Sequence, residues 1–444
     1  MTNTNHDRKS KLLTSIALGA AAAITGGLLL ALPTGTAAAA SKAVATKKGE
    51  LLLWTHSAGN PAEMEKINQW IGEFNKSHPK SKIVFQAFPQ KVYNDSVVAG
   101  ALSKKLPCIL DIDGPNVPNW AFSKYLAPLS IPAATTSDML ATTLGKWNGA
   151  IYAAGQFDAA VALLARKSDL AAFGLRTPTL DKPWTGAEFD AAMKKYQDSK
   201  KFDFAFDPGM AWTGEWYPYG FSPFLQSFGG DLIDRSSYKT AEGKLNGPQA
   251  LAWGKWWQNL FKSGLAPLTQ DGAARDSGFI DGKYGIQWNG IWAVDAASKK
   301  LGSDLLFLPA PDFGSGSKIG GGSWQWGVSA SCSNKKVANE WINFLLEPSR
   351  IAAIADAQNV IPGRGAARPL STKFKEGGEL APFYALSQKQ ALLRPPTPAY
   401  TNIAKVFEKA VGDIANGSDV QTALDTAIDK IDADIKANNG YGAK

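Results

Sequence analysis

The chain has 444 residues, which is too long for one compact core and predicts two lobes. Of these residues 45% are hydrophobic and 19% are charged, which is typical of a soluble globular protein. Its formal net charge of +8 comes without a Lys- or Arg-rich run, which argues against nucleic acid as a partner. All 15 tryptophans lie after residue 50, and so many indicate an aromatic-lined site for an amphipathic ligand.

The first 40 residues are predicted to be a secretory signal peptide. Three basic residues precede an apolar run over 12–32, and small residues end at Ala40. Cleavage is expected before Ser41, with a second possible site after Ala45, and the protein is then expected in the periplasm. Residues 1–40 hold three Lys/Arg and one Asp, so cleavage before Ser41 lowers the net charge from +8 to +6. An uncleaved anchor helix is the competing interpretation, since about 20 apolar residues span a bilayer. No Cys follows the apolar run, so a lipid anchor is not expected.

After a leader over 41–48, strand and helix patterns alternate. Strands are predicted over 51–54, 82–88 and 108–112, and helices over 61–74 and 93–104. Asn60 is a suitable N-cap for the first helix, with Pro61 at its first position. This β-α-β-α-β order predicts an α/β protein with a mostly parallel sheet flanked by helices, and ligands bind past the carboxyl ends of such strands.

The later segments repeat these two patterns and add aromatic residues. Two strand-like runs join at 155–158, and helices are predicted over 186–197, from 248 onward, and along 403–414 and 420–435. Ser418 with Gln421 is expected to cap the last helix. Strands are further predicted over 284–288, 305–309 and 324–330, and the segment 211–234 is dense in aromatic residues.

The order of these segments resembles a known family. The matching pieces are LLLWTHSAGNP, DIDGPNVPNWA, WNGAIYAAGQFDAAVALLARKSDLAAFGL, FLQSFGGDLID, FIDGKYGIQWNGIWAV, GGGSWQWGVSASCSNKKVANEWINFLL and PPTPAYTNIAKVFEKAV. They resemble the extracellular solute-binding proteins of ABC importers, in the carbohydrate-type family that includes maltose-binding protein, over essentially the whole chain after residue 40. The chain departs from that family at Ala165-Arg166, where an aromatic residue and Asn are usual, which bears on packing near the hinge.

The resemblance implies a fold and a function. The fold is the two-lobed periplasmic-binding-protein fold (type II), with a ligand cleft between an N-terminal lobe (49–156 plus 309–352) and a C-terminal lobe (157–308 plus 353–444). The function is that of a non-catalytic, monomeric receptor that needs no cofactor. It captures a mono- or oligosaccharide and delivers it to ABC permease subunits in the membrane.

Two other functions are compatible with the sequence. A secreted glycoside hydrolase would need two carboxyl groups about 5–10 Å apart, for which Asp113 and Glu215 are candidates. A quaternary amine could instead bind in an aromatic cage. Only His56 and His78 remain after cleavage, so neither a metal site nor a metal-chelate ligand is expected.

Sugar binding needs flat aromatic faces for the ring and planar polar groups for its hydroxyls. The candidate ligand-binding residues lie at predicted strand ends, at the hinge, in the aromatic segment and in glycine-rich loops: Trp54, His56, Asp113, Asn116, Gln156, Asp158, Trp212, Glu215, Trp216, Asn289, Trp292, Gly321, Gly322, Trp324 and Arg364.

Several candidates also have a purely structural interpretation. Trp54 could belong to the core, Asp113 to an Asx turn, and Arg364 to a solvated loop. The helix that follows Trp216 could claim that side chain for packing. The sequence leaves these alternatives open.

The two cysteines are predicted to form a disulfide. Cys108 begins the third predicted strand, and Cys332 ends the strand that returns to the first lobe. If the two strands are antiparallel neighbours, both cysteines lie at the pole away from the cleft, and export makes the bond chemically possible.

Overall fold

The computed structural model describes residues 44–270 and 277–442. The predicted signal peptide and its cleavage site lie outside the described residues. Within those residues, no helix combines the length and the apolar character that crossing a membrane requires.

The first sheet is built from the early part of the chain and one late strand. Its strands are β1 (Leu51–Thr55), β2 (Ile83–Ala87), β3 (Ile109–Asp113), β4 (Leu126–Ala127), β5 (Leu144–Trp147), β6 (Ala150–Ala154) and β13 (Trp324–Ser329), in the order β2-β1-β3-β13-β6-β5, with β4 also paired to β13. Pairing is parallel for β1 with β2 and β3, and antiparallel for β13 and β5–β6. The sheet is therefore mixed rather than mostly parallel, because β13 re-enters it from a crossing segment.

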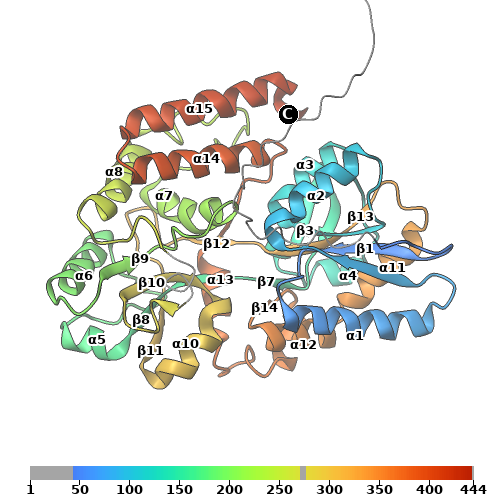
Figure 1. The fold of residues 1–444 in the computed structure, drawn as a ribbon, viewed down its shortest axis with the longest axis horizontal. Coiled ribbons are helices and arrows are strands. Elements are labelled where there is room, and N and C mark those ends of the chain that lie inside the picture. Colours follow the sequence, from blue (N-terminus) through green and yellow to red (C-terminus); the bar gives the residue numbers. More distant parts are fainter. Residues whose placement is uncertain (1–43, 271–276, 443–444) are drawn as a thin grey trace, which may run out of the picture. The chain divides into compact units, whose positions relative to one another are not determined.

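Helices cover both faces of the first sheet (Figure 1). They are α1 (Pro61–Ser77), α2 (Gln90–Leu102), α3 (Val117–Phe122), α4 (Ala133–Thr136), α11 (Lys335–Leu345) and α12 (Pro348–Gln358). Alternate residues of β3 face opposite sides, so Ile109 packs in the cluster that holds α1, α11 and α12, whereas Leu110 packs with α2 and α3. The predicted cap of α1 is confirmed, since the Asn60 side chain accepts from the Glu63 N–H and Pro61 opens the helix.

The second sheet has four strands. These are β8 (Val161–Arg166), β9 (Phe204–Asp207), β10 (Tyr284–Gly290) and β11 (Leu305–Leu308), in the order β11-β8-β10-β9, and only β9 and β10 are parallel. Its helices are α5 (Lys167–Ala172), α6 (Gly186–Asp198), α7 (Ser222–Phe228), α8 (Pro248–Lys262), α10 (Val294–Leu301), α13 (Ala381–Gln390), α14 (Tyr400–Ala415) and α15 (Val420–Ala437). Buried residues of β8–β10 and of α6, α7, α8, α13, α14 and α15 form one continuous cluster.

Short helical turns complete the secondary structure. They are η1 (Gly114–Asn116), η2 (Ala141–Thr143), η3 (Tyr217–Phe221, a π-helical turn), η4 (Ile291–Ala293), η5 (Gly302–Asp304), η6 (Gly365–Leu370) and η7 (Asn439–Gly442). The N-cap of α15 is Asp419 and not the predicted Ser418, because the Asp419 carboxylate accepts from the Thr422 N–H.

We call each sheet with its helices the first half and the second half. The chain passes between them through two pairs of short strands (Figure 1). In one pair β7 (Phe157–Asp158) is antiparallel to β14 (Ile361–Pro362), and in the other β12 (Ile319–Gly321) is parallel to β15 (Ala391–Leu393). The exact lobe boundaries implied by the resemblance stay predictions.

A disulfide joins Cys108 and Cys332. Cys108 directly precedes β3, Cys332 follows β13, and the two strands are antiparallel neighbours. The bond therefore lies at the opposite end of these strands from Asp113 and Trp324, which are partners in the same ladder.

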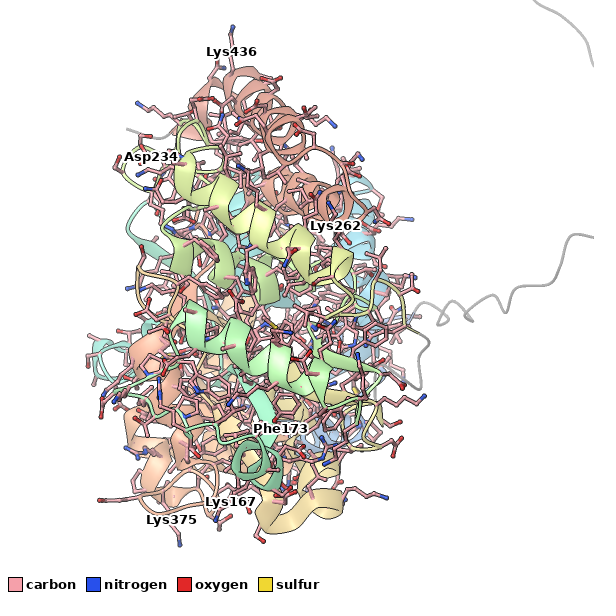
Figure 2. All side chains as sticks on the ribbon, turned by 90° about the vertical axis from the view of Figure 1, so that its left-hand side faces the viewer. Lys167, Phe173, Asp234, Lys262, Lys375 and Lys436 are labelled. Carbon is pink, nitrogen blue, oxygen red and sulfur yellow. A yellow bond between two sulfur atoms is a disulfide. The ribbon has the colours of Figure 1, made fainter. Side chains whose placement is uncertain are left out.

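Some charged side chains of the second half are exposed. Lys262 at the end of α8, Lys375, and Lys436 at the end of α15 are examples (Figure 2).

Candidate functional site

Two predicted site residues are neighbours in the first sheet. Asp113 is the last residue of β3, Trp324 is the first of β13, and the antiparallel register places them opposite each other. Asp113 is only 5% exposed, so its carboxylate needs partners that compensate for lost hydration.

Those partners come from Arg394, which follows β15. Arg394 Nη2 donates to Asp113 Oδ1 at 2.9 Å and Nη1 donates to Oδ2 at 3.0 Å, which makes a two-point ion pair. Nη1 also donates to Glu215 Oε2 at 2.7 Å, and the Tyr400 hydroxyl donates to the same oxygen at 2.6 Å. Glu215 directly precedes Trp216 and η3, and η3 is fixed to the second sheet by the bond from Trp288 Nε1 to the Gly220 carbonyl.

Burial and charge shift the pKa values of this network in consistent directions. Burial opposes the charge of Arg394, but the Asp113 carboxylate and its neighbours outweigh it and raise the pKa of the guanidinium. Burial raises the pKa of Glu215, and the charge of Arg394 opposes that shift. Burial and the nearby Glu215 charge raise the pKa of Tyr400. Arg394 therefore stays charged and Tyr400 stays a hydrogen-bond donor at neutral pH.

An aromatic cluster with one exposed member lies in the second half. Trp292, in η4, is 42% exposed, and its ring centroid is 5.7 Å from that of Trp212, 6.1 Å from that of Trp216 and 6.4 Å from that of Tyr219. Trp216 is 7% exposed and supports the others from within. The cluster leaves part of the Trp292 indole exposed to solvent on a largely buried aromatic base, and such an exposed aromatic surface can pack against a sugar ring.

Trp324 is covered on one face by His56. The two rings are nearly parallel, with an interplanar angle of 5° and centroids 3.5 Å apart. His56 Nδ1 lies 2.6 Å from Asp111 Oδ2. Burial lowers the pKa of His56, but the charge and the hydrogen bond of Asp111 together raise it by more, so the pKa is raised overall. Trp324 is thus fixed from beneath by a hydrogen-bonded imidazole.

Glu63 lies close to this pair. Ligand atoms of His56, Glu63 and Asp111 all fall within 4.8 Å of one another, and burial raises the pKa of Glu63 to about 7. These three residue types could hold a metal ion, but the His56–Asp111 contact is already a direct hydrogen bond. The geometry is that of a buried proton-sharing network.

Asp158 connects several segments near the crossing strands. Its Oδ1 accepts from the backbone N–H groups of Ala159 and Gly322, at 2.8 and 3.0 Å, and its Oδ2 accepts from the hydroxyls of Thr142 and Ser387, at 2.8 and 2.9 Å. Gly322 has φ of 97°, which favours glycine and turns its N–H toward the carboxylate. Asp158 therefore joins η2, the segment after β12 and α13.

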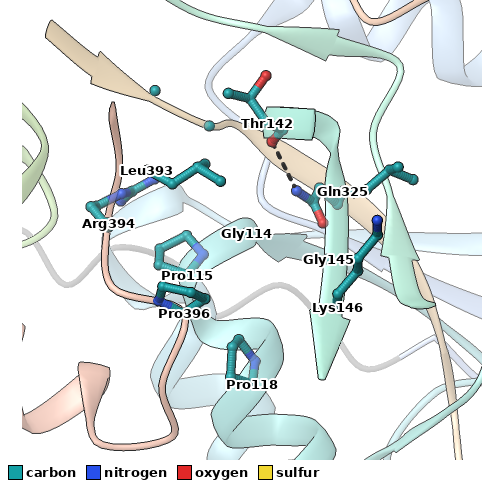
Figure 3. Close-up of a pocket in the computed structure, with 13 residues that line it drawn as sticks. Gly114, Pro115, Pro118, Thr142, Gly145, Lys146, Gln325, Leu393, Arg394 and Pro396 are labelled. Carbon is teal, nitrogen blue, oxygen red and sulfur yellow. Dashed lines mark hydrogen bonds between the residues drawn. The ribbon is translucent and has the colours of Figure 1, made fainter. Parts of the chain in front are cut away.

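A small pocket opens beside Arg394 (Figure 3). Its volume is about 40 Å³, and residues from η1, β5, β13 and the two crossing segments line it, among them Pro115, Lys146, Gln325 and Leu393. Gln325 Nε2 donates to the Thr142 carbonyl at 3.3 Å, and among the described residues Gln325 Oε1 and Arg394 Nε have no hydrogen-bond partner. Buried polar atoms without partners in a cavity are suited to binding a hydroxyl-bearing molecule.

The sequence was compared with known proteins. A family sequence model described as bacterial extracellular solute-binding protein matches residues 69–382. This chain belongs to that family. The resemblance predicted from the sequence is confirmed at this level.

Individual relatives of this solute-binding protein are distant. The maltodextrin-binding protein MdxE of Bacillus subtilis is 24% identical over 260 residues, which are 55% of this chain and 60% of that protein. The diacetylchitobiose binding protein DasA of Streptomyces coelicolor is 23% identical over 331 residues, or 71% of this chain and 73% of that one. The GacH receptor of Streptomyces glaucescens superposes with a TM-score of 0.72 at 21% identity, over 88% of this chain and 98% of GacH. These similarities confirm the predicted fold class, a two-lobed α/β solute-binding fold.

Two of the predicted contact residues of this solute-binding protein, Trp54 and Gln156, have partners within the chain. Trp54 packs against Phe88, with ring centroids 5.0 Å apart, and against Gly100 of α2. Gln156 is buried, donates to the Leu345 carbonyl at 3.0 Å and accepts from Trp326 at 3.4 Å.

Asn289 and Arg364 likewise have partners within the chain. Asn289 is buried and bonds to Gln287 at 3.1 Å and to the Gly290 N–H at 2.8 Å. Arg364 pairs with Asp138 at 3.0 Å and donates to the Leu346 carbonyl at 2.7 Å, so it is not the solvated loop charge of the alternative interpretation.

The remaining candidates divide in a simple way. Asn116 in η1 is buried, and its Nδ2 has no hydrogen-bond partner within the described part of the chain. Gly321 and Gly322 line the small pocket. The structure thus brings together Asp113 with Glu215, and Trp212 with Trp216 and Trp292.

The residue that connects these groups, Arg394, is not among the predicted site residues. Arg394 stands in Leu392-Leu393-Arg394-Pro395-Pro396, and no local periodicity marks it as functional. Tyr219 and Tyr400 were also missed, although Tyr219 lies in the aromatic segment. The local sequence did contain one indication that Arg394 has a partner. It is a single Arg before two prolines in an otherwise apolar run, and an arginine in such a run is costly to bury unless it is paired.

Proposed function

We propose that this solute-binding protein captures a mono- or oligosaccharide between its two halves and delivers it to ABC permease subunits. Family membership gives the general role of solute capture. Relatives named for maltodextrin and diacetylchitobiose binding, and a structural neighbour described in complex with acarbose, support a saccharide as the solute class.

One structural observation carries the proposal. Contacts run without a break from Trp292 to Tyr219, from the Tyr219 ring to the Arg394 guanidinium at 5.3 Å, and from Arg394 to Asp113 beside Trp324. Aromatic side chains therefore stand at both ends of a buried polar strip that draws on both halves. An oligosaccharide needs this alternation, because its rings present apolar C–H faces and its rim presents hydroxyls.

Entry of a saccharide requires the two halves to separate. The cavity of about 40 Å³ is far below the roughly 300–1,000 Å³ of ordinary ligand sites. Hinge rotation about the crossing strand pairs β7–β14 and β12–β15 provides such a movement, and closure around the solute follows.

A hydrolase is less compatible with this site. Hydrolysis needs one carboxylic acid free to give a proton and one carboxylate free to attack or to activate water. Asp113 receives both Nη atoms of Arg394, and the same Nη1 binds Glu215. The arrangement supports binding without catalysis.

The groups that could bind a cationic solute are already occupied by a side chain of the protein. Two carboxylates and the Tyr219 ring surround a positive charge, as a quaternary amine would need, and that charge is the guanidinium of Arg394 itself. A neutral, hydroxyl-rich solute fits the remaining surface better. We propose further that the protein is exported, cleaved near Ala40 and monomeric.

Intrinsic tryptophan fluorescence and thermal shift against a panel of monosaccharides, maltodextrins, chitooligosaccharides, polyols and betaines test the proposal. Saturable saccharide binding with a dissociation constant in the micromolar range or below, and no release of reducing sugar, is the expected result. Binding of betaines alone, or turnover of a saccharide without a stable complex, would overturn it.

A further inference from the structure

Arg394 connects the two halves through side chains of the chain itself. Asp113 ends a strand of the first half, Glu215 precedes η3 of the second half, and Arg394 lies in the segment after β15. Arg394 donates hydrogen bonds to both carboxylates.

The oxygens of the two carboxylates are used unequally. Both oxygens of Asp113 accept from Arg394, which leaves this carboxylate committed to the ion pair. Both bonds to Glu215 reach the single oxygen Oε2, and the Glu215 side chain is 29% exposed. Glu215 is therefore the member that movement of the halves can release at least cost.

We propose that Arg394 is a positioning residue that sets the resting separation of the two halves, by tying Asp113 of the first half to Glu215 of the second half across the binding site. This inference rests on the proposed function, since it assigns a role within the same site. The tie lowers the fraction of molecules that are open to solute, and apparent affinity falls in proportion to that fraction.

A structural ion pair that merely holds the fold would leave this balance unchanged. The discriminating variant is Glu215→Gln, because it weakens the tie between the halves while Arg394 keeps its ion pair with Asp113 and no cation is stranded. Asp113→Asn is the complementary variant, because it weakens the same tie from the first half while Glu215 keeps Arg394 paired.

Glu188→Gln provides the matched control. Glu188 pairs with Arg176 at 2.6 Å, and both residues lie within the second half, so this variant removes an Arg–Glu pair without touching the proposed tie.

The first measurement is small-angle X-ray scattering of the exported protein without saccharide. We expect Glu215→Gln and Asp113→Asn to have a larger radius of gyration than the parent, and Glu188→Gln to superpose on the parent. Superposable curves for the parent, Glu215→Gln and Asp113→Asn would overturn the proposal. If Glu215→Gln does not fold, Asp113→Asn alone decides.

The second measurement separates association from dissociation by stopped-flow fluorescence with the saccharide that binds. Glu215→Gln is expected to raise the association rate constant about five-fold, the factor for one hydrogen bond, with a smaller change in the dissociation rate constant. An effect confined to dissociation would contradict a resting tie. If no saccharide binds, the proposed function fails, whereas the scattering experiment still tests the tie.

Discussion

Trp292 offers a direct test of where a saccharide stacks. The side chain is 42% exposed, and the buried remainder packs on Trp212, Trp216 and Tyr219. For a side chain of about 250 Å² the exposed part is about 100 Å², and at about 25 cal/mol per Å² its burial by a sugar ring contributes about 2.5 kcal/mol. Complete loss of that contribution corresponds to about 70-fold in the dissociation constant.

Trp292→Ala is therefore expected to weaken saccharide binding by about 10- to 70-fold, because a pyranose covers only part of the indole face. Isothermal titration calorimetry with the tightest-binding saccharide measures this change. Phe122→Ala is the matched control, since Phe122 on α3 is 39% exposed and makes an edge contact with Tyr441. Equal dissociation constants for the parent and Trp292→Ala, with a folded variant, would refute the stacking argument.

Three further predictions follow from buried groups. Replacing Cys108 and Cys332 with Ala should lower the free energy of unfolding by about 2–5 kcal/mol, because the disulfide closes a loop across 224 positions. Thiol titration of the denatured, unreduced parent should find no free thiol, and two free thiols would contradict the disulfide. The pKa of folded His56 is raised above 6.5, so its contribution to stability should be complete below pH 6.5 and be lost as pH rises through the raised pKa. In urea unfolding, the difference in free energy of unfolding between the parent and His56→Gln should therefore shrink above pH 6.5. A difference that grows with pH would refute the assignment. Asp158→Asn should lower the free energy of unfolding by less than about 1 kcal/mol, because the amide oxygen can keep the two backbone N–H bonds while the amide NH₂ donates to the two hydroxyls. Asp158→Ala should lower the free energy of unfolding by about 3 kcal/mol, because all four bonds are lost. Equal losses for the two variants in urea unfolding would show that the charge itself is required.

The sequence was sufficient where function depends on neighbours in the chain. Strand ends are visible as a change from apolar to polar residues, and this change predicted that Asp113 ends a strand, where the structure pairs it with Arg394. The cap at Asn60 is also local and was predicted. The class of fold followed from the order of such local signals.

The sequence was insufficient where partners are distant. Arg394 and Asp113 are 281 positions apart, and nothing in either neighbourhood indicates the other. Trp54 illustrates the second difficulty: a strand-end aromatic can point to either face, and this one packs against Gly100 of α2 rather than into the site. The direction of a side chain depends on register, which only the folded sheet shows.

The place of β13 in the first sheet bears on the order in which this protein can fold. β13 pairs with β3 on one side and β6 on the other, although the whole second sheet lies between β6 and β13 in sequence. During synthesis the edges of β3 and β6 therefore remain unpaired until residues 324–329 are available, and unpaired strand edges readily pair with other chains. A fragment that ends before residue 324 is expected to aggregate, by size-exclusion chromatography, rather than to persist as a separate N-terminal domain.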